Sequence, residues 1–332
     1  MPDDSKTVLL VANPKSGATE SGARVRALQE AIQARGHVCE LVHDLESVAP
    51  KSEQLQSQGL LKAVIAAGGD GTADALANRI SEKIPLLMFP LGTENLLARH
   101  FGLKADIEAT CSTLDEGRKI QIDAGSANGQ KFLVMTSCGF DAEVVRQMHK
   151  IRKGHINRWS YTRPILTALK KYRFPALNIE LDSETKMKLT DEPRQASLPV
   201  SAPTTLNAAW IFVFNLPMYA ANLDFCPQAD PADGKLDVCT FRAGGVLRGL
   251  GYFTRLFLRR HQSMTDFHHQ LAERIQIHSG ATSPSSSPGT TGQNAEEVEN
   301  GIAFQIDGDP GGTLPLDIQV LPNHLSLLIP RA

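Results

Sequence analysis

The stretch AVIAAGGDGTADALANRI, residues 63–80, decides the fold of this chain. An apolar run suited to a buried strand leads into Gly68 and Gly69, the acid Asp70, a third glycine and a segment with helical spacing. Glycine lacks a Cβ and lets the backbone approach a ligand closely, and the helix that follows directs free N–H groups at an anion. The same residues suit a plain turn in which Thr72 caps the helix. Alone, the stretch leaves a phosphate site and a structural turn equally open.

The first 120 residues repeat this strand-to-helix pattern. Apolar runs alternate with segments of helical spacing, which predicts an α/β domain whose parallel sheet is flanked by helices. The carboxyl ends of parallel strands share one edge of the sheet, where ligands bind. Three loops follow strands and are expected at that edge: 13–17, 68–72 and 91–95.

The first and third of these loops support a phosphate site. The sequence NPKSG adds the positive charge of Lys15, and PLGTEN supplies donors from Gly92, Thr93 and Asn95. Neither loop has Walker A or G-x-G-x-x-G spacing. Together the three loops predict a phosphate-binding arrangement of another kind.

From about residue 121 the pattern changes to short strand-like segments separated by turn residues. This predicts a mainly antiparallel second domain with helical interruptions near 155–172 and 244–260. Residues 279–301 have a low-complexity composition rich in serine, glycine and threonine, and we expect them to be disordered.

Composition limits the class of protein. The chain has 332 residues, which favours two domains, and a formal net charge of -2, which gives no sign of nucleic-acid binding. No apolar run approaches the roughly 18 residues of a spanning helix, and the acidic N-terminus fits no secretory signal, so we expect a cytoplasmic protein. The cysteines are far apart and the histidines, including His268 and His269, show no metal spacing, so neither disulfides nor a zinc site is predicted. The five cysteines are Cys39, Cys111, Cys138, Cys226 and Cys239.

The motifs NPKSG, GGDGTADAL and PLGTENLLARHFGL, in this order, resemble the diacylglycerol kinase catalytic-domain family, which includes bacterial lipid kinases and sphingosine and ceramide kinases. The likeness continues through MTSCGFDAEVV (135–145), ADPADGKLDV (229–238) and QIDGDPGG (305–312). It implies an NAD-kinase-like nucleotide domain over 1–120 and a β-sandwich lipid-substrate domain over 121–314. A final segment, 315–332, would return to the first domain.

The resemblance also implies roles for individual residues. The proton acceptor falls on Asp309, where the family usually has glutamate in an Asp-Gly-Glu motif and this chain has DGD. The shorter side chain reaches about one methylene less, so activity or acceptor is expected to differ. The ATP site implied by the resemblance comprises Asn13, Pro14, Lys15, Ser16, Gly17, Asp44, Gly68, Gly69, Asp70, Gly71, Thr72, Ala73, Asp74 and Thr93.

Transfer of a γ-phosphoryl group requires positioning, charge neutralisation by Mg²⁺ and a group that accepts the hydroxyl proton. Asp70 is the candidate for the Mg²⁺-nucleotide, and Asp309 is the candidate base. If residues 305–309 are extended, Asp307 and Asp309 point to one face and form a catalytic acid pair. The alternative is an exposed Asp-Gly turn.

A second metal site is implied by the segment DPADGKLD. In related bacterial kinases a structural Mg²⁺ lies near the matching positions, which carry over to Asp230, Asp233 and the carbonyl of Lys235. A plain turn is equally compatible with this spacing.

Two acid-free stretches suggest contact with a membrane. Nine lysines or arginines lie between Glu143 and Glu180, and residues 241–260 hold five arginines interleaved with apolar side chains. Each stretch could rest on anionic lipid or form a helix packed on the sandwich with a solvated basic face. A lipid substrate favours membrane contact by one of them.

The leading hypothesis is an ATP-dependent lipid kinase, using Mg²⁺, that phosphorylates a hydroxyl of a diacylglycerol-like or sphingoid lipid at a membrane surface. It would be cytoplasmic with peripheral membrane association, and a homodimer stays open. One alternative is an NAD kinase-like enzyme, since NAD kinases share the GGDG motif. The other is a catalytically degenerate protein that binds nucleotide or lipid, suggested by DGD, by TENL (93–96) and by YAANLD (219–224).

Overall fold

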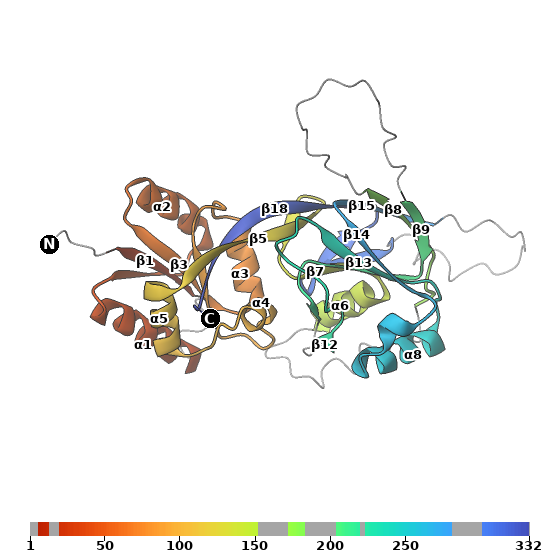
Figure 1. Ribbon diagram of the computed structural model, residues 1–332, viewed down its shortest axis with the longest axis horizontal. Helices are drawn as coiled ribbons and strands as arrows, with labels where there is room; N and C mark the ends of the chain where they lie inside the picture. The colour runs from red at the N-terminus through yellow and green to blue at the C-terminus, as the bar shows by residue number, and fades with distance from the viewer. Residues whose placement is uncertain are drawn as a thin grey trace, which may run out of the picture.

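The computed structural model describes residues 6–12, 20–151, 172–182, 204–219, 223–280 and 301–331. It has two lobes joined by two long strands (Figure 1). The loop NPKSG, most of the first basic stretch with the helix expected near 155–172, and nearly all of the low-complexity segment lie outside the described residues.

The N-terminal lobe is built around four parallel strands in the order β2-β1-β3-β4. These strands are apolar because helices cover the sheet and bury it on both faces. The predicted α/β class is therefore confirmed. The strands are β1 (Thr7–Ala12), β2 (Val38–Val42), β3 (Leu61–Gly68) and β4 (Leu86–Pro90). The helices are α1 (Glu20–Ala34), α2 (Leu45–Ser57), α3 (Asp70–Ala77), α4 (Leu96–His100) and α5 (Ile107–Glu116).

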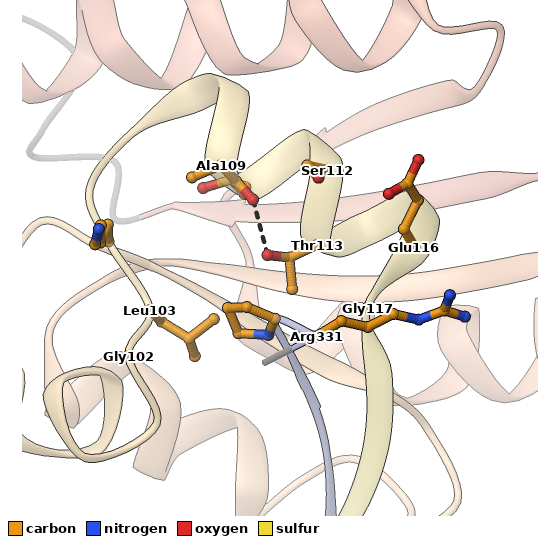
Figure 2. Close-up of a pocket in the computed structure, with 11 residues that line it drawn as sticks. Gly102, Leu103, Ala109, Ser112, Thr113, Glu116, Gly117 and Arg331 are labelled. Carbon is orange, nitrogen blue, oxygen red and sulfur yellow. Dashed lines mark hydrogen bonds between the residues drawn. The ribbon is translucent and has the colours of Figure 1, made fainter.

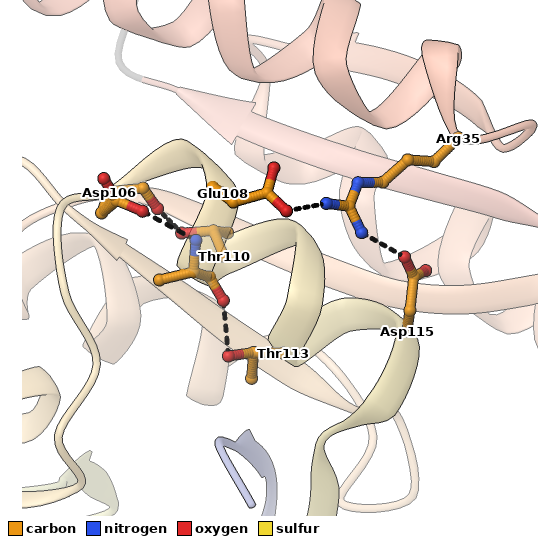
Figure 3. A network of polar contacts seen from close by, with 7 residues as sticks. Arg35, Asp106, Glu108, Thr110, Thr113 and Asp115 are labelled. Atoms are coloured by element: carbon orange, nitrogen blue, oxygen red, sulfur yellow. Dashed lines mark hydrogen bonds and ion pairs between the residues drawn. The ribbon is translucent and has the colours of Figure 1, made fainter.

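Polar contacts fix α1 against α5. Arg35, which follows α1, donates to Glu108 and, at 2.9 Å, to Asp115 on α5 (Figure 3). Asp106 caps α5 by accepting a hydrogen bond from the Ala109 N–H at 2.7 Å. Exposed ion pairs of this kind contribute about 1 kcal/mol or less, so they orient two helices that apolar packing already holds.

Two long antiparallel strands, β5 (Arg118–Ala127) and β18 (Leu316–Ile329), connect the lobes. The C-terminal strand β18 also pairs in parallel with β4 through Leu327 and Leu86, and it lies antiparallel to β15 (Arg274–Ser279). A ten-stranded sheet therefore runs through both lobes, and β6 (Gln130–Phe132), β8 (Leu177–Asp182) and β9 (Thr204–Ala208) complete it.

A second, antiparallel sheet of six strands faces this extension across an apolar core. Ile211 and Val238 of the second sheet belong to the same buried cluster as Ile179 and Ile275 of the first. This arrangement confirms the predicted β-sandwich. The sheet order is β14 (Phe267–Ala272), β13 (Leu236–Phe241), β10 (Trp210–Phe214), β7 (Met135–Gly139), β16 (Ala303–Ile306) and β17 (Asp309–Thr313).

The other face of the second sheet is covered by α6 (Phe140–Ile151), α8 (Val246–Phe257) and the small pair β11 (Met218–Tyr219) and β12 (Leu223–Asp224). An aromatic cluster that includes Phe140, Trp210 and Phe225 fills this layer. Among the described helices none is long and apolar enough to cross a bilayer.

Candidate functional site

Two of the predicted loops meet at the carboxyl edge of the parallel sheet. The Leu91 N–H donates to the Gly68 carbonyl at 2.9 Å, and the loops approach backbone to backbone at Gly69 and Gly92. A Cβ on Gly92 would lie 2.6 Å from the Cα of Gly69. Side chains are therefore excluded at this contact, which explains why both positions are glycine.

Asp70 joins these loops. Its carboxylate accepts hydrogen bonds from the backbone N–H groups of Leu96 and Leu97, at 3.0 and 3.1 Å, and thereby caps α4. Burial raises the pKa of Asp70, and these two hydrogen bonds partly offset the rise. The cap of α3 is Gly69, without a side-chain hydrogen bond, so the expectation that Thr72 caps this helix is wrong. Asp70 thus positions the third loop, and its contact with Mg²⁺ stays a prediction.

Other predicted nucleotide contacts also have structural partners. Asn95, at a φ of 50°, accepts from the Gly92 N–H at 3.0 Å and donates to its carbonyl at 2.8 Å, while Thr93 is exposed. Asp44 is exposed and caps α2 through the Glu46 N–H at 3.1 Å. These side chains hold the loops in place, and their contacts with a nucleotide stay predictions.

The segment expected to be extended at 305–309 is a hairpin. Asp307 and Gly308, with φ of 47° and 87°, form the turn between β16 and β17. Positive φ at both central residues is typical of the type I′ turn that Asp-Gly favours. The expectation that Asp307 and Asp309 share one face of a strand is therefore wrong. The turn is not simply exposed either, because the Asp307 carboxylate points inward.

The Asp307 carboxylate is enclosed by backbone donors. It accepts from the N–H groups of Leu133, Val134 and Met135 at 2.7, 3.1 and 2.8 Å. These donors come from the link between β6 and β7 and from the start of β7, so Asp307 fixes the hairpin against this part of the sandwich. Its oxygens have little capacity left for a substrate proton.

Three acids from the two lobes influence one another electrostatically. Burial, together with the charge of Asp309, raises the pKa of Asp74 on α3 to about 6. Burial, together with the charge of Asp74, raises the pKa of Asp307 to about 7. Asp309, at the start of β17, is exposed. The structure thus brings Asp74, Asp307 and Asp309 together, and a divalent cation is the kind of ligand that relieves such repulsion.

Asn78 and Lys131 hold α3 against the sandwich, and sequence reasoning missed both. Asn78 donates to Asp74 at 3.1 Å and accepts from the backbone N–H of Lys131 at 3.1 Å. The Lys131 ammonium donates to the Ala77 carbonyl at 3.2 Å, and its charge lowers the pKa of Asp74. No local motif marks these two residues, since they meet only when the lobes pack.

A buried polar chain leads from the Asp307–Gly308 turn to α6, on the outer side of the second sheet. Asp141, at the start of α6, accepts hydrogen bonds from the hydroxyls of Ser137 and Tyr219, and its burial raises its pKa. Gln305 donates to Ser137 at 3.0 Å and accepts from the Gly308 N–H at 2.8 Å. The sequence motif containing Asp141 supported the family resemblance, but no role was assigned to this residue.

The predicted second metal site lies in a tight loop over a buried acid. Asp230 accepts from the Ala232 N–H at 3.0 Å and Asp233 from the Lys235 N–H at 2.9 Å, as in a plain turn. Asp123, below them, accepts from the Gly234 N–H at 2.7 Å. Burial and the neighbouring acids raise the pKa of Asp233. Oxygen donors at this spacing suit Mg²⁺, so that site stays a prediction.

A separate pocket of about 320 Å³ lies beside α5 (Figure 2). The Thr113 hydroxyl in its wall donates to the Ala109 carbonyl at 2.7 Å. The predicted site residues that the structure describes do not line it, so the pocket is distinct from the acid cluster. Its lining residues are Gly102, Leu103, Lys104, Ala109, Thr110, Ser112, Thr113, Glu116, Gly117, Pro330 and Arg331.

Known proteins share this architecture. A diacylglycerol kinase of Mycobacterium tuberculosis is 28% identical over 338 residues, covering 98% of this chain and 95% of that protein. A Pseudomonas aeruginosa protein named "Probable lipid kinase YegS-like" is 27% identical and covers 71% of this chain and 72% of its own. The crystal structure of a diacylglycerol kinase from Bacillus anthracis, 16% identical, has a TM-score of 0.59 and covers 98% and 97% of the two chains, which supports the fold.

Two family descriptions divide the chain between them. Residues 7–127 match the diacylglycerol kinase catalytic domain, and residues 134–329 match the YegS C-terminal NAD kinase β-sandwich-like domain. The second match alone covers more than half of the chain. The protein belongs to the diacylglycerol kinase and YegS-like lipid kinase family.

Proposed function

We propose that this protein is an ATP-dependent lipid kinase that transfers the γ-phosphoryl group of ATP to a hydroxyl of a diacylglycerol-like or sphingoid lipid. One observation carries the proposal: the glycine loops lie at the N-terminal end of α3, and the charge of Asp309, from the hairpin of the other lobe, acts on Asp74 of the same helix. A phosphate on the loops and a hydroxyl from the sandwich side would therefore approach each other.

In the proposed reaction the lipid hydroxyl oxygen forms a bond to the γ-phosphorus, the bond to the bridging β,γ-oxygen breaks, and ADP leaves. Asp309 accepts the hydroxyl proton, since it is exposed and near enough for its charge to act on Asp74. Gly69 and Gly92 offer backbone surface to the phosphates. Asp70 keeps these loops together and holds the start of α4.

The acids fit Mg²⁺ by the chemistry of their donors, because hard oxygen ligands with mutual repulsion suit a divalent cation. Asp74 is the residue that would hold it, so that Asp309 serves as the base, and the ion would supply charge neutralisation at the transferring phosphoryl group. Asp307 acts as a positioning residue, since backbone N–H groups already occupy its carboxylate.

Peripheral membrane association is part of the same proposal, and α8 carries it. Leu247, Leu250 and Phe257 are 85%, 57% and 76% exposed on one face of this helix. Gly249 and Tyr252, on the opposite face, pack onto the sandwich. The exposed face is therefore apolar. A helix that only packed on the sandwich would instead present a solvated basic face.

Cations flank this apolar face. Arg248 and Arg255 are both exposed. Because successive residues of a helix are rotated by about 100°, these two arginines share one side of α8, next to the apolar face. A helix with an apolar face and adjacent arginines suits the interface of an anionic bilayer. Helix α8 lies against β12, and β11, the partner of β12, lies against α4. Helix α8 is thus connected, through β12 and β11, to the helix α4 that Asp70 caps.

Sedimentation with anionic vesicles tests the membrane proposal. The double variant Leu247→Glu and Leu250→Glu should lose most vesicle binding while keeping its unfolding midpoint, because both side chains are exposed. The matched control is Leu60→Glu, which changes a leucine that is 44% exposed in the other lobe. Equal vesicle binding by the double variant and the control would refute a role for α8.

A panel of acceptors with γ-labelled ATP tests the kinase proposal. The panel contains diacylglycerol, sphingoid bases, ceramide and NAD, the lipids in mixed vesicles with Mg²⁺. Label is expected in a lipid and absent from NAD. Label in NAD alone would establish the NAD kinase-like alternative, and Mg-ATP binding without transfer to any acceptor would establish a binding protein.

A further inference from the structure

Four potential metal ligands meet on the outer face of the second sheet, away from the acid hairpin. Asp237 and Cys239 are two residues apart on β13, so their side chains share a face. His269 on β14 is directly opposite Cys239 in the antiparallel register. Cys226, from the loop after β12, covers this face, with its N–H donating to the Pro217 carbonyl at 3.1 Å.

The donor atoms converge. One ligand atom each of Cys226, Asp237 and His269 lies within 4.8 Å of the others. Asp237 Oδ1 is 2.7 Å from His269 Nε2 and 3.5 Å from Cys226 Sγ, and Cys226 Sγ is 3.7 Å from Cys239 Sγ. From these distances and this donor set we propose that Cys226, Asp237 and His269 bind a zinc ion. Cys239 lies outside this group of three, and in the proposed structural site its side chain turns toward them to supply the fourth ligand.

Two of the separations between donor atoms are close to those of a tetrahedral centre. Zinc–sulfur bonds of about 2.3 Å and zinc–oxygen or zinc–nitrogen bonds of about 2.0–2.1 Å place two sulfurs about 3.8 Å apart and a sulfur and an oxygen about 3.6 Å apart. The sulfur pair and the sulfur–oxygen pair already have these separations. The hydrogen-bonded His269–Asp237 pair must open by about 0.6 Å to reach the roughly 3.3 Å of a nitrogen–oxygen edge. Cys239 must also approach Asp237 and His269, since it is not among the ligand atoms that lie within 4.8 Å of one another.

The chemistry of the donors favours zinc over the hard cations of the phosphoryl-transfer site. Two thiolates, an imidazole and a carboxylate form a soft to borderline set, whereas Mg²⁺ selects oxygens. Cys226 and Cys239 are fully buried and Asp237 is 1% exposed, while the His269 side chain keeps 27% of its surface. His269 therefore marks the entry path, and the enclosed thiols fit a closed, structural centre.

The proposed metal would link the loop after β12 to the paired strands β13 and β14 at one edge of the second sheet. Sequence spacing excluded such a site, because its ligands lie up to 43 residues apart and form no C-x-x-C or H-x-H pair. The juxtaposition arises from the register of β13 with β14 and from the loop that carries Cys226 over them.

Metal analysis of the full chain, purified under reducing conditions without chelator, tests this inference. We expect about one zinc per chain. After removal with a chelator, cobalt titration should give the visible spectrum of a tetrahedral site with a sulfur-to-cobalt charge-transfer band. A chain that binds neither zinc nor cobalt, or that joins Cys226 to Cys239 in a disulfide when thiols are counted, would overturn the proposal.

Variants locate the site. We expect a loss of zinc affinity of at least about 100-fold in each of the variants Cys226→Ser, Cys239→Ser and His269→Gln. Mutation of residues that merely hydrogen-bond to metal ligands already lowers metal affinity by up to about 100-fold. Cys111→Ser is the matched control, because Cys111 is also a buried free thiol but lies on α5. If the cysteine variants are insoluble, His269→Gln decides, because its side chain is partly exposed. Wild-type zinc affinity in His269→Gln would refute the site.

A thermal readout separates this metal from the kinase reaction. Chelation should lower the melting temperature of the wild-type chain and of Cys111→Ser, and it should leave that of His269→Gln unchanged. Neither result depends on phosphoryl transfer, so failure of the zinc site and failure of the kinase proposal are distinguishable. An unchanged wild-type melting temperature on chelation of a zinc-loaded sample would contradict a structural role.

Discussion

Replacing Asp74 with asparagine should make the protein more stable and less active. The pKa of this carboxyl is raised from 3.8 to about 6 by burial and by the charge of Asp309. Between these two values the native state binds more protons than the unfolded chain, so the free energy of unfolding falls as pH rises through this range. Above about pH 6 Asp74 is ionised in the native state, and its buried charge lowers the free energy of unfolding by the full amount.

The size of the effect follows from the shift. Two pKa units correspond to about 3 kcal/mol, and partial exposure of Asp74 reduces this to about 1–2 kcal/mol by solvent screening. Asp74→Asn removes the charge and keeps an oxygen for the hydrogen bond from Asn78. We therefore expect a gain of about 1–2 kcal/mol at pH 7.5 and roughly half of it at pH 5.

Urea unfolding at the two pH values, without Mg²⁺, measures this gain. The control is Asp44→Asn, an exposed helix cap whose replacement should change little, because asparagine caps as well as aspartate does. Lipid phosphorylation by Asp74→Asn should fall at least about 10-fold despite the greater stability, as expected where function requires a destabilised site. A variant that is less stable at pH 7.5, or whose gain is independent of pH, would refute the electrostatic account of the cluster.

Three further variants examine neighbouring parts of the site. Asp70→Asn replaces a carboxylate that accepts two backbone N–H groups, so urea unfolding should show a loss of about 1–2 kcal/mol; unchanged stability would contradict the capping role. Gly92→Ala places a Cβ 2.6 Å from Gly69 Cα and forces the two loops apart. Equilibrium dialysis should therefore show weaker Mg-ATP binding than for the wild-type chain, and equal binding would show that nucleotide binding does not depend on this contact. Asp309→Glu adds a methylene at an exposed position and should transfer phosphate to lipid at least as fast as wild type; a rate near zero would show that the shorter acid is required.

The sequence predicted those parts of the site that depend on neighbouring segments. Glycine-rich loops after adjacent parallel strands must share one sheet edge, and Gly69 and Gly92 touch there. The hairpin at Asp307 was misjudged because alternation in QIDGD resembles a strand, whereas the Asp-Gly pair is itself a signal for a type I′ turn. At this position the turn preference of the Asp-Gly pair outweighed the strand-like alternation of the sequence.

The remaining features depend on contacts that no local pattern records. Asp74 meets Asp309 only because β18 brings the two lobes together, and Asn78 meets Lys131 for the same reason. The roles of Asp70 and Asn95 as supports for the loops follow from hydrogen bonds that a motif cannot show. The sequence therefore indicated which residues belong to the candidate site, but not which of them support the loops and which face a substrate.

Phosphoryl transfer from γ-labelled ATP to lipid, compared between the wild-type chain and Asp309→Asn, tests the central claim most directly. Because Asp309 is exposed and its charge adds to the repulsion on Asp74, the variant should be at least as stable as the wild-type chain and should bind Mg-ATP. Its turnover should fall at least about 100-fold, the usual contribution of a general base. Labelled lipid formed at equal rates by both proteins would contradict the assignment of this acid hairpin to catalysis.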